Sequence, residues 1–479
     1  MVTLVVDTLQ STDYLVTVNI SELAGIATKV SAAETQLGNL PVSAVQFGAL
    51  GGGHDDTVAI QAATNASKNV TLPEGNWLVS NTIQLQPGGR LTGAGMLRTR
   101  LQRKGIWLGP TVRIGQADGS VSAGDCAVKG MVVEQLHPGF ELGVSSTMVD
   151  RLLNEQAQIS CYGGYACEFD DLWFQHGVYG IELYGCVVPS LSRLRSFGAW
   201  DNKIPAVCEQ KAVVRLGSNA AVPGHAFCTE VRMDKLYIGT GAPSAPRTIT
   251  VGSDISYTAY ENLGSKWALQ IEAVEGLSVT RSYLGGPAAE CVAFIPASIC
   301  TMIRFDDTFF DETYFANVRF YAGNNAVIGI SFGPGCLFNG QSHTRHAIFA
   351  DDNGGQPTVI GMTVQGMYSN MLETPFYFAN AKAVVFNGPI VSAYNTKMSK
   401  TNSQVISAGA YFDAPCREIH VNGGLWGGGT NSWSTSNGCK WGPVWATSSV
   451  GTACNVRGIL SSTITGGTLV GGISQTYPT

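Results

Sequence analysis

The chain has 479 residues and a formal net charge of −6, and only 13% of its residues are charged, about half of the usual ~25%. Its 58 glycines are about 12% of the chain, against a usual ~7%. This composition excludes intrinsic disorder, which combines low hydrophobicity with high charge, and coiled-coil rods or helical repeats, which are rich in Glu, Lys and Leu. Many glycines with few charges favour an all-β protein with many turns. The net negative charge gives no sign of the basic surface that proteins use to bind nucleic acid.

The first forty residues differ from the rest of the chain. Residues 1–18 have no basic region and include Asp7 and Asp13, so we expect no signal peptide, and no apolar run reaches the ~18 residues of a membrane span. Residues 20–37 predict a short helix whose apolar residues recur near heptad spacing. This helix either packs on its own domain or forms a neck that bundles several chains.

Short strands and a glycine loop follow the helix. The chain reads VQFGALGGGHDDTVAIQAA from residue 45, then VTLPEGNWLVSNTIQL from residue 70 and LTGAG from residue 91. This order and spacing resembles the opening of the pectate-lyase-like parallel β-helix family, which includes bacteriophage tailspikes and capsule depolymerases. The resemblance covers roughly residues 45–95, about a tenth of the chain. It implies a parallel β-helix, a homotrimer and activity on a polysaccharide.

Beyond residue 120 the chain repeats a loose unit of two short strands. The period is irregular, at about 20–45 residues, which is typical of a solenoid whose coils carry insertions. We therefore expect an all-β fold, a right-handed single-stranded parallel β-helix with a short N-terminal helix and a β-rich C-terminal cap. The expected domains are an attachment or neck segment (1–40), a β-helix body with the glycan-binding and catalytic site (41–420), and a cap that stabilises a trimer (421–479).

Aromatic residues recur in the second strand of each unit. Aligned on the glycine that ends these strands, they form one outward column, which suits a sugar chain because its C–H faces stack on rings. Alternatively the rings pack inward, since a register slip of one residue flips every side chain. The column comprises Trp173, Phe197, Tyr237, Tyr283, Tyr321, Tyr368 and Trp426, and Arg281 is a further glycan-binding candidate.

Acidic residues recur in the first strands. Glu272 and Asp306 are 34 residues apart, which could be one coil and would place their backbones about 5 Å apart. That separation is compatible with the two-carboxylate mechanism of glycoside hydrolysis. Asp307 is the third catalytic candidate, and Asp311 and Glu312 extend this acidic cluster. Alternatively these acids lie in solvated turns, or a site between subunits draws acids from two chains.

A polysaccharide lyase needs a base and a cation instead. Arg281 and Tyr283 are two residues apart and would point the same way on one strand, and His176 is a second base candidate. The seven histidines form no HExxH motif, and the twelve cysteines form no CxxC pair, so we expect no metal and no cofactor. Reduced, buried thiols are expected.

These features predict a phage tailspike that recognises and depolymerises a bacterial surface polysaccharide, which could be capsule, exopolysaccharide or O-antigen, by hydrolysis with paired carboxylates. The alternatives are β-elimination, a binding-only receptor-recognition fibre, and a cellular lyase or pectinase, which the missing export signal disfavours. The expected partners are the polysaccharide, two further copies of the chain, and other phage tail or adaptor proteins at the N-terminus. We expect no nucleic acid and no membrane insertion. The expected location is the virion tail, assembled in the host cytoplasm.

Overall fold

The computed structural model describes part of the chain, and all structural statements below concern that part. Residues 25–29 are helical, and the rest of the predicted helix over 20–37 lies outside the described residues. The described ranges are 25–29, 40–103, 109–120, 123–135, 157–175, 179–196, 210–218, 226–239, 245–251, 255–261, 265–286, 289–313, 315–323, 325–340, 344–371, 373–393, 408–413, 415–427, 441–445, 455–457, 460–461, 468–470 and 473–475.

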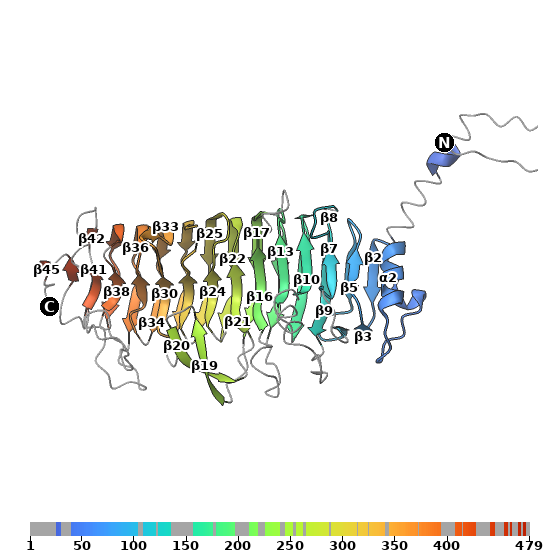
Figure 1. Ribbon diagram of the computed structural model, residues 1–479, viewed down its shortest axis with the longest axis horizontal. Helices are drawn as coiled ribbons and strands as arrows, with labels where there is room; N and C mark the ends of the chain where they lie inside the picture. The colour runs from blue at the N-terminus through green and yellow to red at the C-terminus, as the bar shows by residue number, and fades with distance from the viewer. Residues whose placement is uncertain are drawn as a thin grey trace, which may run out of the picture.

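The body is a long stack of coils, shown in Figure 1 with its axis horizontal. A typical coil contains β22 (Val274–Thr280), β23 (Tyr283–Gly285) and β24 (Glu290–Phe294). The next strand, β25 (Cys300–Asp306), begins another coil and pairs in parallel with β22. Each coil thus adds one strand to each of three ladders, and the fold is the predicted parallel β-helix. Its hand stays a prediction.

The first and second ladders form one 25-stranded sheet, because β9 and β12 run through both, and the third ladder is a 14-stranded sheet. The first ladder contains β1 (Val42–Ser43), β2 (Asn69–Leu72), β5 (Arg90–Gly93), β9 (Ala127–Gln135), β12 (Glu168–Gln175), β14 (Ser190–Ser192), β17 (Cys228–Asp234), β22, β25, β28 (Val327–Phe332), β33 (Val359–Gln365), β36 (Ala381–Asn387), β39 (Arg417–Asn422) and β42 (Asn455–Arg457). The second ladder adds β3 (Gly75–Val79), β6 (Thr99–Arg103), β15 (Arg195–Ser196), β18 (Tyr237–Ile238), β23, β26 (Phe309–Asp311), β29 (Leu337–Asn339), β34 (Tyr368–Met371), β37 (Ile390–Ala393), β40 (Leu425–Gly427) and β43 (Leu460–Ser461). The third contains β4 (Ile83–Leu85), β7 (Val112–Ile114), β10 (Ala157–Tyr162), β13 (Tyr179–Tyr184), β16 (Gln210–Gly217), β21 (Ser265–Ile271), β24, β27 (Ala316–Phe320), β30 (His346–Ala350), β35 (Phe376–Phe378), β38 (Ala408–Phe412), β41 (Trp441–Trp445), β44 (Thr468–Val470) and β45 (Ile473–Gln475).

The coils differ in length because the connections between strands differ. Asn69 pairs with Arg90, 21 residues later, whereas Thr229 pairs with Glu275, 46 residues later. The long coil carries an antiparallel hairpin of β19 (Ala245–Val251) and β20 (Ile255–Glu261), which Figure 1 shows projecting from the body. Two short pairs, β8 (Ala123–Gly124) with β11 (Gly164–Tyr165) and β31 (Asp352–Asn353) with β32 (Gln356–Pro357), complete the strands. The irregular repeat is as predicted.

The interior is a set of ladders of apolar side chains, one side chain from each coil. The rings of Phe294 and Phe320 stack with centroids 4.8 Å apart, and those of Phe310 and Phe338 with centroids 4.5 Å apart. Each fully buried ring stabilises the fold by about 1.5–3 kcal/mol. Nine described cysteines are free and buried, as predicted.

The two ends of the stack are covered differently. At the N-terminal end the short helix η1 (Ala44–Phe47) and α2 (Thr57–Ala66) lie against the first coil (Figure 1). Past residue 420 the parallel pairing continues, since β40, β41 and β42 still pair with the coil before, and β44 and β45 close the end antiparallel. The division into three domains stays a prediction. No helix among the described residues is long and apolar enough to cross a membrane.

Candidate functional site

The second ladder carries a row of residues that share one register position. Trp173 pairs with Arg195, Arg195 with Tyr237, and Tyr237 with Tyr283. The row continues through Phe309 and Leu337 to Tyr368. We call these residues the aromatic row. Four residues of the predicted column, Trp173, Tyr237, Tyr283 and Tyr368, thus share one register position, and their role in glycan binding stays a prediction.

Two rings of the aromatic row stack on each other across adjacent coils. The ring centroids of Tyr237 and Tyr283 are 4.9 Å apart with an interplanar angle of 18°. Phe309 packs edge-on against Tyr283 at 5.4 Å. Tyr237 is 44% exposed, so this cluster faces solvent and does not form part of the core.

A tight turn between the first and second ladders places charged residues beside these rings. In five consecutive coils a residue other than glycine adopts the left-handed conformation there, with φ between 46° and 55°. Each of these residues lies two positions before a member of the aromatic row, so the turn and the row run in parallel along the stack. The five residues are Asp171, Arg193, Lys235, Arg281 and Asp307.

The turn and the row together line a groove with a volume of about 990 Å³, which we call the corner groove. It gathers three aromatic rings, four cations and two carboxylates. The rings are Tyr237, Tyr283 and Phe309, the cations Arg193, Arg195, Lys235 and Arg281, and the carboxylates Asp171 and Asp307. The sequence predicted Tyr237, Arg281, Tyr283 and Asp307 as site residues, and the structure brings these four together.

The other groove residues were missed, although a local pattern marks them. In the sequence a charged residue stands two positions before each row residue from Trp173 to Phe309, as in Asp171-Leu-Trp173, Arg193-Leu-Arg195 and Lys235-Leu-Tyr237. Alternate residues along a strand face the same side. A search for this repeated triplet, in place of a search for aromatic residues alone, would have found the cations.

Two arginines of the corner groove form ion pairs with aspartates of the first ladder. The Arg281 guanidinium donates from Nε and Nη2 to Asp234, at 2.8 and 2.6 Å. Arg193 makes the same forked contact with Asp170, with Nε at 2.8 Å from Oδ1. Hydrogen bonding from Arg193 lowers the pKa of Asp170. Two-point contacts of this kind fix the direction in which a guanidinium points.

At the end of the groove near Phe309, Asp307 lines the groove, and Asp311 and Asp306 lie next to lining residues without lining it themselves. The Tyr283 hydroxyl donates to Asp311 Oδ2 at 2.8 Å, and Asn339 donates to the other oxygen at 2.7 Å. Burial, followed by this hydrogen bond, raises the pKa of Tyr283. Asp306 ends β25 and contacts Arg304, and its Oδ1 is buried without a hydrogen-bond partner among the described residues.

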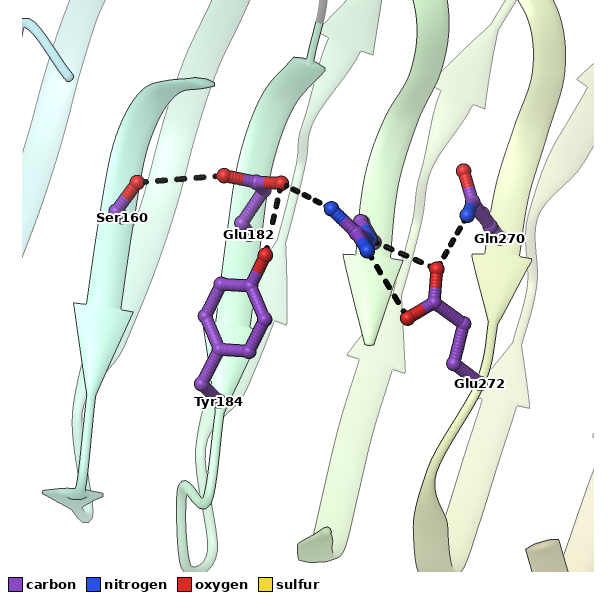
Figure 2. Close-up of polar contacts among 6 residues, drawn as sticks. Ser160, Glu182, Tyr184, Gln270 and Glu272 are labelled. Carbon is purple, nitrogen blue, oxygen red and sulfur yellow. Dashed lines mark hydrogen bonds and ion pairs between the residues drawn. The ribbon is translucent and has the colours of Figure 1, made fainter. Parts of the chain in front are cut away.

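Glu272 lies elsewhere, next to the third ladder, in a buried cluster around Arg215 (Figure 2). Arg215 donates from Nε and Nη2 to the two oxygens of Glu272 at 2.9 and 3.0 Å, and from Nη1 to Glu182 at 2.9 Å. Tyr184 also donates to Glu182, and Gln270 to Glu272. Burial raises the pKa of Glu182, and the charge of Arg215 opposes that rise.

The predicted pairing of Glu272 with Asp306 is therefore wrong. Asp306 pairs with Thr280 in the first ladder, whereas Glu272 follows β21 in the third. A separation of 34 residues exceeds the length of this coil, because Gln270 pairs with Ala293, only 23 residues later. Glu272 is only 7% exposed, and both of its oxygens bind the Arg215 guanidinium, which is the arrangement of a structural ion pair.

The prediction that Tyr321 and Trp426 belong to the aromatic row is also wrong. Trp426 is fully buried, because Leu425 holds the row position opposite Ile390 and the next residue turns inward. Tyr321 follows β27 of the third ladder, where its hydroxyl donates to Glu290 at 3.0 Å. Phe197 and His176 lie outside the described residues. The described residues hold no cluster of His, Cys, Asp or Glu that could bind a metal ion.

Comparison with known proteins supports the fold. No protein-family model matches the sequence, and no curated protein matches it. A mutant tailspike protein of E. coli bacteriophage HK620, solved in complex with a hexasaccharide, is 13% identical, with a TM-score of 0.55 over 87% of this chain and 80% of its own. The chain has the parallel β-helix fold of phage tailspikes.

Proteins of other kinds share this fold. PfbA, a surface adhesin of Streptococcus pneumoniae, is 14% identical, with a TM-score of 0.53 over 89% of this chain and 92% of its own. The catalytic unit of an α-1,3-glucanase from Streptomyces thermodiastaticus is 14% identical, with a TM-score of 0.50 over 86% and 68%. The chain spans 65% of the length of ORF18 of Geobacillus virus E2. At these identities the likeness concerns the fold alone.

Proposed function

We propose that this chain is a bacteriophage tail protein that binds a bacterial surface polysaccharide in the corner groove. The observation that carries the proposal is the solvent-exposed stack of Tyr237 and Tyr283 inside a groove of about 990 Å³. Ring faces attract the C–H faces of sugars, while hydroxyls stay in water or bind charged side chains. The fold shared with a tailspike solved with a hexasaccharide supports the assignment to a phage.

The groove is long enough for several sugars. Its lining residues come from five successive coils, from Asp171 to Asp307, and successive parallel strands lie about 4.8 Å apart, which gives a length of roughly 19 Å. A chain that follows the row would meet the rings of Tyr237, Tyr283 and Phe309 in turn. The repeat of the protein therefore favours a polymer as ligand over a single sugar.

Hydrolysis of the bound polysaccharide is a second proposed function, favoured by the carboxylates at one end of the groove. Asp307 lines the groove, and Asp311 holds the hydroxyl of the groove residue Tyr283. One carboxyl group would protonate the leaving oxygen, and the other would act as nucleophile or activate a water. We assign these roles to Asp307 and Asp311, in place of the predicted Glu272 and Asp306.

β-Elimination has less support from the groove. A lyase base must lose its proton near neutral pH, and the raised pKa of Tyr283 opposes this. Tyr283 also donates its proton to Asp311, so the phenol serves as a hydrogen-bond donor here. Arg281 remains a proposed binding residue, because it lines the groove while its guanidinium contacts Asp234 through two N–H groups.

A panel of capsulated bacterial strains tests both functions. Haloes on lawns, together with new reducing ends from purified polysaccharide, would support hydrolysis, and unsaturated uronate in the product would support elimination. Binding without product would leave a recognition fibre. Failure of the protein to bind any strain or any purified surface polysaccharide would reject the proposal.

The resemblance and the fold also support the assembly that we propose, a homotrimer attached through residues 1–40 to other tail proteins and assembled in the host cytoplasm. Most strands of a solenoid pair on both sides, and contacts between subunits would add to this stability. Light scattering should give the mass of three 50.6 kDa chains. A mass near one chain would contradict the trimer.

A further inference from the structure

The lining of the corner groove has more cations than carboxylates, although the chain as a whole is acidic. Its four cations outnumber its two carboxylates, whereas the chain has a formal net charge of −6. Charges of one sign gathered in a concave surface raise the local concentration of ligands of the other sign. The excess of cations over carboxylates is a property of the groove lining, and the aspartates that pair with Arg193 and Arg281 lie outside that lining.

Two of these cations are not used for internal ion pairs. Lys235 and Arg195 are exposed, and neither forms an ion pair with another described residue. Arg193 and Arg281 contact their aspartates through Nε and Nη2. Their side chains remain more than half exposed in these contacts. All four cations can thus reach a ligand while the groove is formed.

The backbone under the cations adopts a conformation that usually requires glycine. Arg193, Lys235 and Arg281 have φ of 51°, 55° and 48°, in a region that costs free energy for residues with a side chain. Glycine occupies the same turn before the groove, at Gly130, and after it, at Gly335 and beyond. At this turn, residues other than glycine take the left-handed conformation in the coils that line the groove, and glycine takes it in the coils on either side.

From these observations we infer that the polysaccharide bound in the corner groove is anionic and carries carboxylate or phosphate groups along its backbone. The inference rests on the proposed function and narrows it to a substrate class. Guanidinium groups bind both anions through paired N–H donors, and Lys235 adds a point charge. Lys235 stands two residues before Tyr237, and Arg281 two residues before Tyr283, so a bound chain would meet a cation and a stacking ring in the same coil.

The test begins with an array of purified bacterial surface polysaccharides, half of them neutral and half bearing uronate or phosphate. Each polysaccharide that binds the full chain is titrated at rising salt, and again after its carboxyl groups are reduced or its phosphodiesters removed. We expect only anionic polysaccharides to bind, with affinity falling as salt screens the charges. Carboxyl reduction or phosphate removal should abolish binding, and the treatment that succeeds identifies the anion.

Substitutions of groove residues test whether the dependence of binding on salt and on anionic groups arises in the corner groove. Arg195→Gln and Lys235→Gln should each weaken binding about 2- to 5-fold at low salt, given the usual strength of exposed ion pairs, and should flatten the salt dependence. Lys382→Gln is the matched control, because it removes a positive charge that pairs with Glu418 outside the groove. Its affinity should equal that of the wild type.

The outcomes separate this inference from the proposed function. Tight, salt-independent binding of a neutral polysaccharide that Tyr237→Ala abolishes would overturn the anionic class and leave polysaccharide binding in the groove intact. Unchanged binding of an anionic polysaccharide by the Arg195 and Lys235 variants would also overturn it. Absence of binding to every polysaccharide would overturn both.

Discussion

Tyr237 and Tyr283 are 46 residues apart in the sequence, and their rings stack at 4.9 Å because they occupy the same position in adjacent coils. Neither ring belongs to the core. Tyr237 is 44% exposed, and the Tyr283 hydroxyl is held by Asp311. The pair therefore presents an ordered aromatic surface in a groove whose other walls are charged.

Tyr237→Ala should weaken polysaccharide binding by about 1–3 kcal/mol, by analogy with bases stacked on aromatic residues. Because the ring is exposed, the melting temperature should change little. Titration of the polysaccharide and a thermal melt of the same sample measure the two effects. A variant that melts early but binds normally would show that the ring supports the fold and does not contact the ligand.

Trp426→Ala should have the opposite effects. The ring is fully buried and packs against Phe376 and Phe386, so its removal should cost about 3–5 kcal/mol of stability. Affinity for the polysaccharide should be unchanged in the fraction that folds. Reduced affinity at full stability would return Trp426 to the set of binding residues.

Arg215→Met should destabilise the protein by about 3–5 kcal/mol, because two buried carboxylates would lose their cation. Burial already raises the pKa of Glu182, and without Arg215 it would rise further. The folded state would then hold a proton more tightly than the unfolded state, so stability should increase as the pH falls from neutral toward about 4.3, the unfolded value for Glu.

Melting temperatures of wild type and Arg215→Met between pH 5 and pH 8 check this prediction. Lys129→Met is a suitable control, since Lys129 pairs with Glu168, which is 42% exposed, and such a pair contributes little. If Arg215→Met is equally unstable across the range, its effect comes from packing and not from the unpaired carboxylates.

Asp307→Asn and Asp311→Asn should each lower turnover by about 10²–10⁴-fold if they act as acid and base, with polysaccharide binding nearly unchanged. Glu272→Gln should instead lower thermal stability and retain turnover, because its carboxylate is bound to Arg215. Tyr283→Phe controls for positioning, since it removes only the hydrogen bond to Asp311.

Rates from reducing-end assays measure turnover, and dissociation constants from titration measure polysaccharide binding, so the two effects of each variant can be separated. Full activity in both aspartate variants would place the catalytic acids elsewhere, and Asp306→Asn would then be the next variant to measure. Loss of activity in Glu272→Gln at normal stability would restore Glu272 as a catalytic residue.

Part of the site followed from sequence alone, because the second strands could be aligned with one another on the glycine that ends them. The triplets around Trp173, Tyr237 and Tyr283 have the same spacing from turn to strand, so aligning them placed all three correctly in one row. The alignment failed at Trp426, where two glycines precede the strand and the row position falls on Leu425. A shift of one residue reverses the face of the strand.

The sequence by itself indicated a parallel β-helix with an irregular repeat, through its resemblance to the pectate-lyase-like family over residues 45–95 and its loose repeat of short apolar strands between turns. The tertiary structure decided which residues meet. Glu272 and Asp306 lie on different ladders because the length of each connection, and not the number of residues between two acids, sets where a strand stacks. Arg193, Lys235 and Arg281 likewise come together only because three coils of different length return to the same turn.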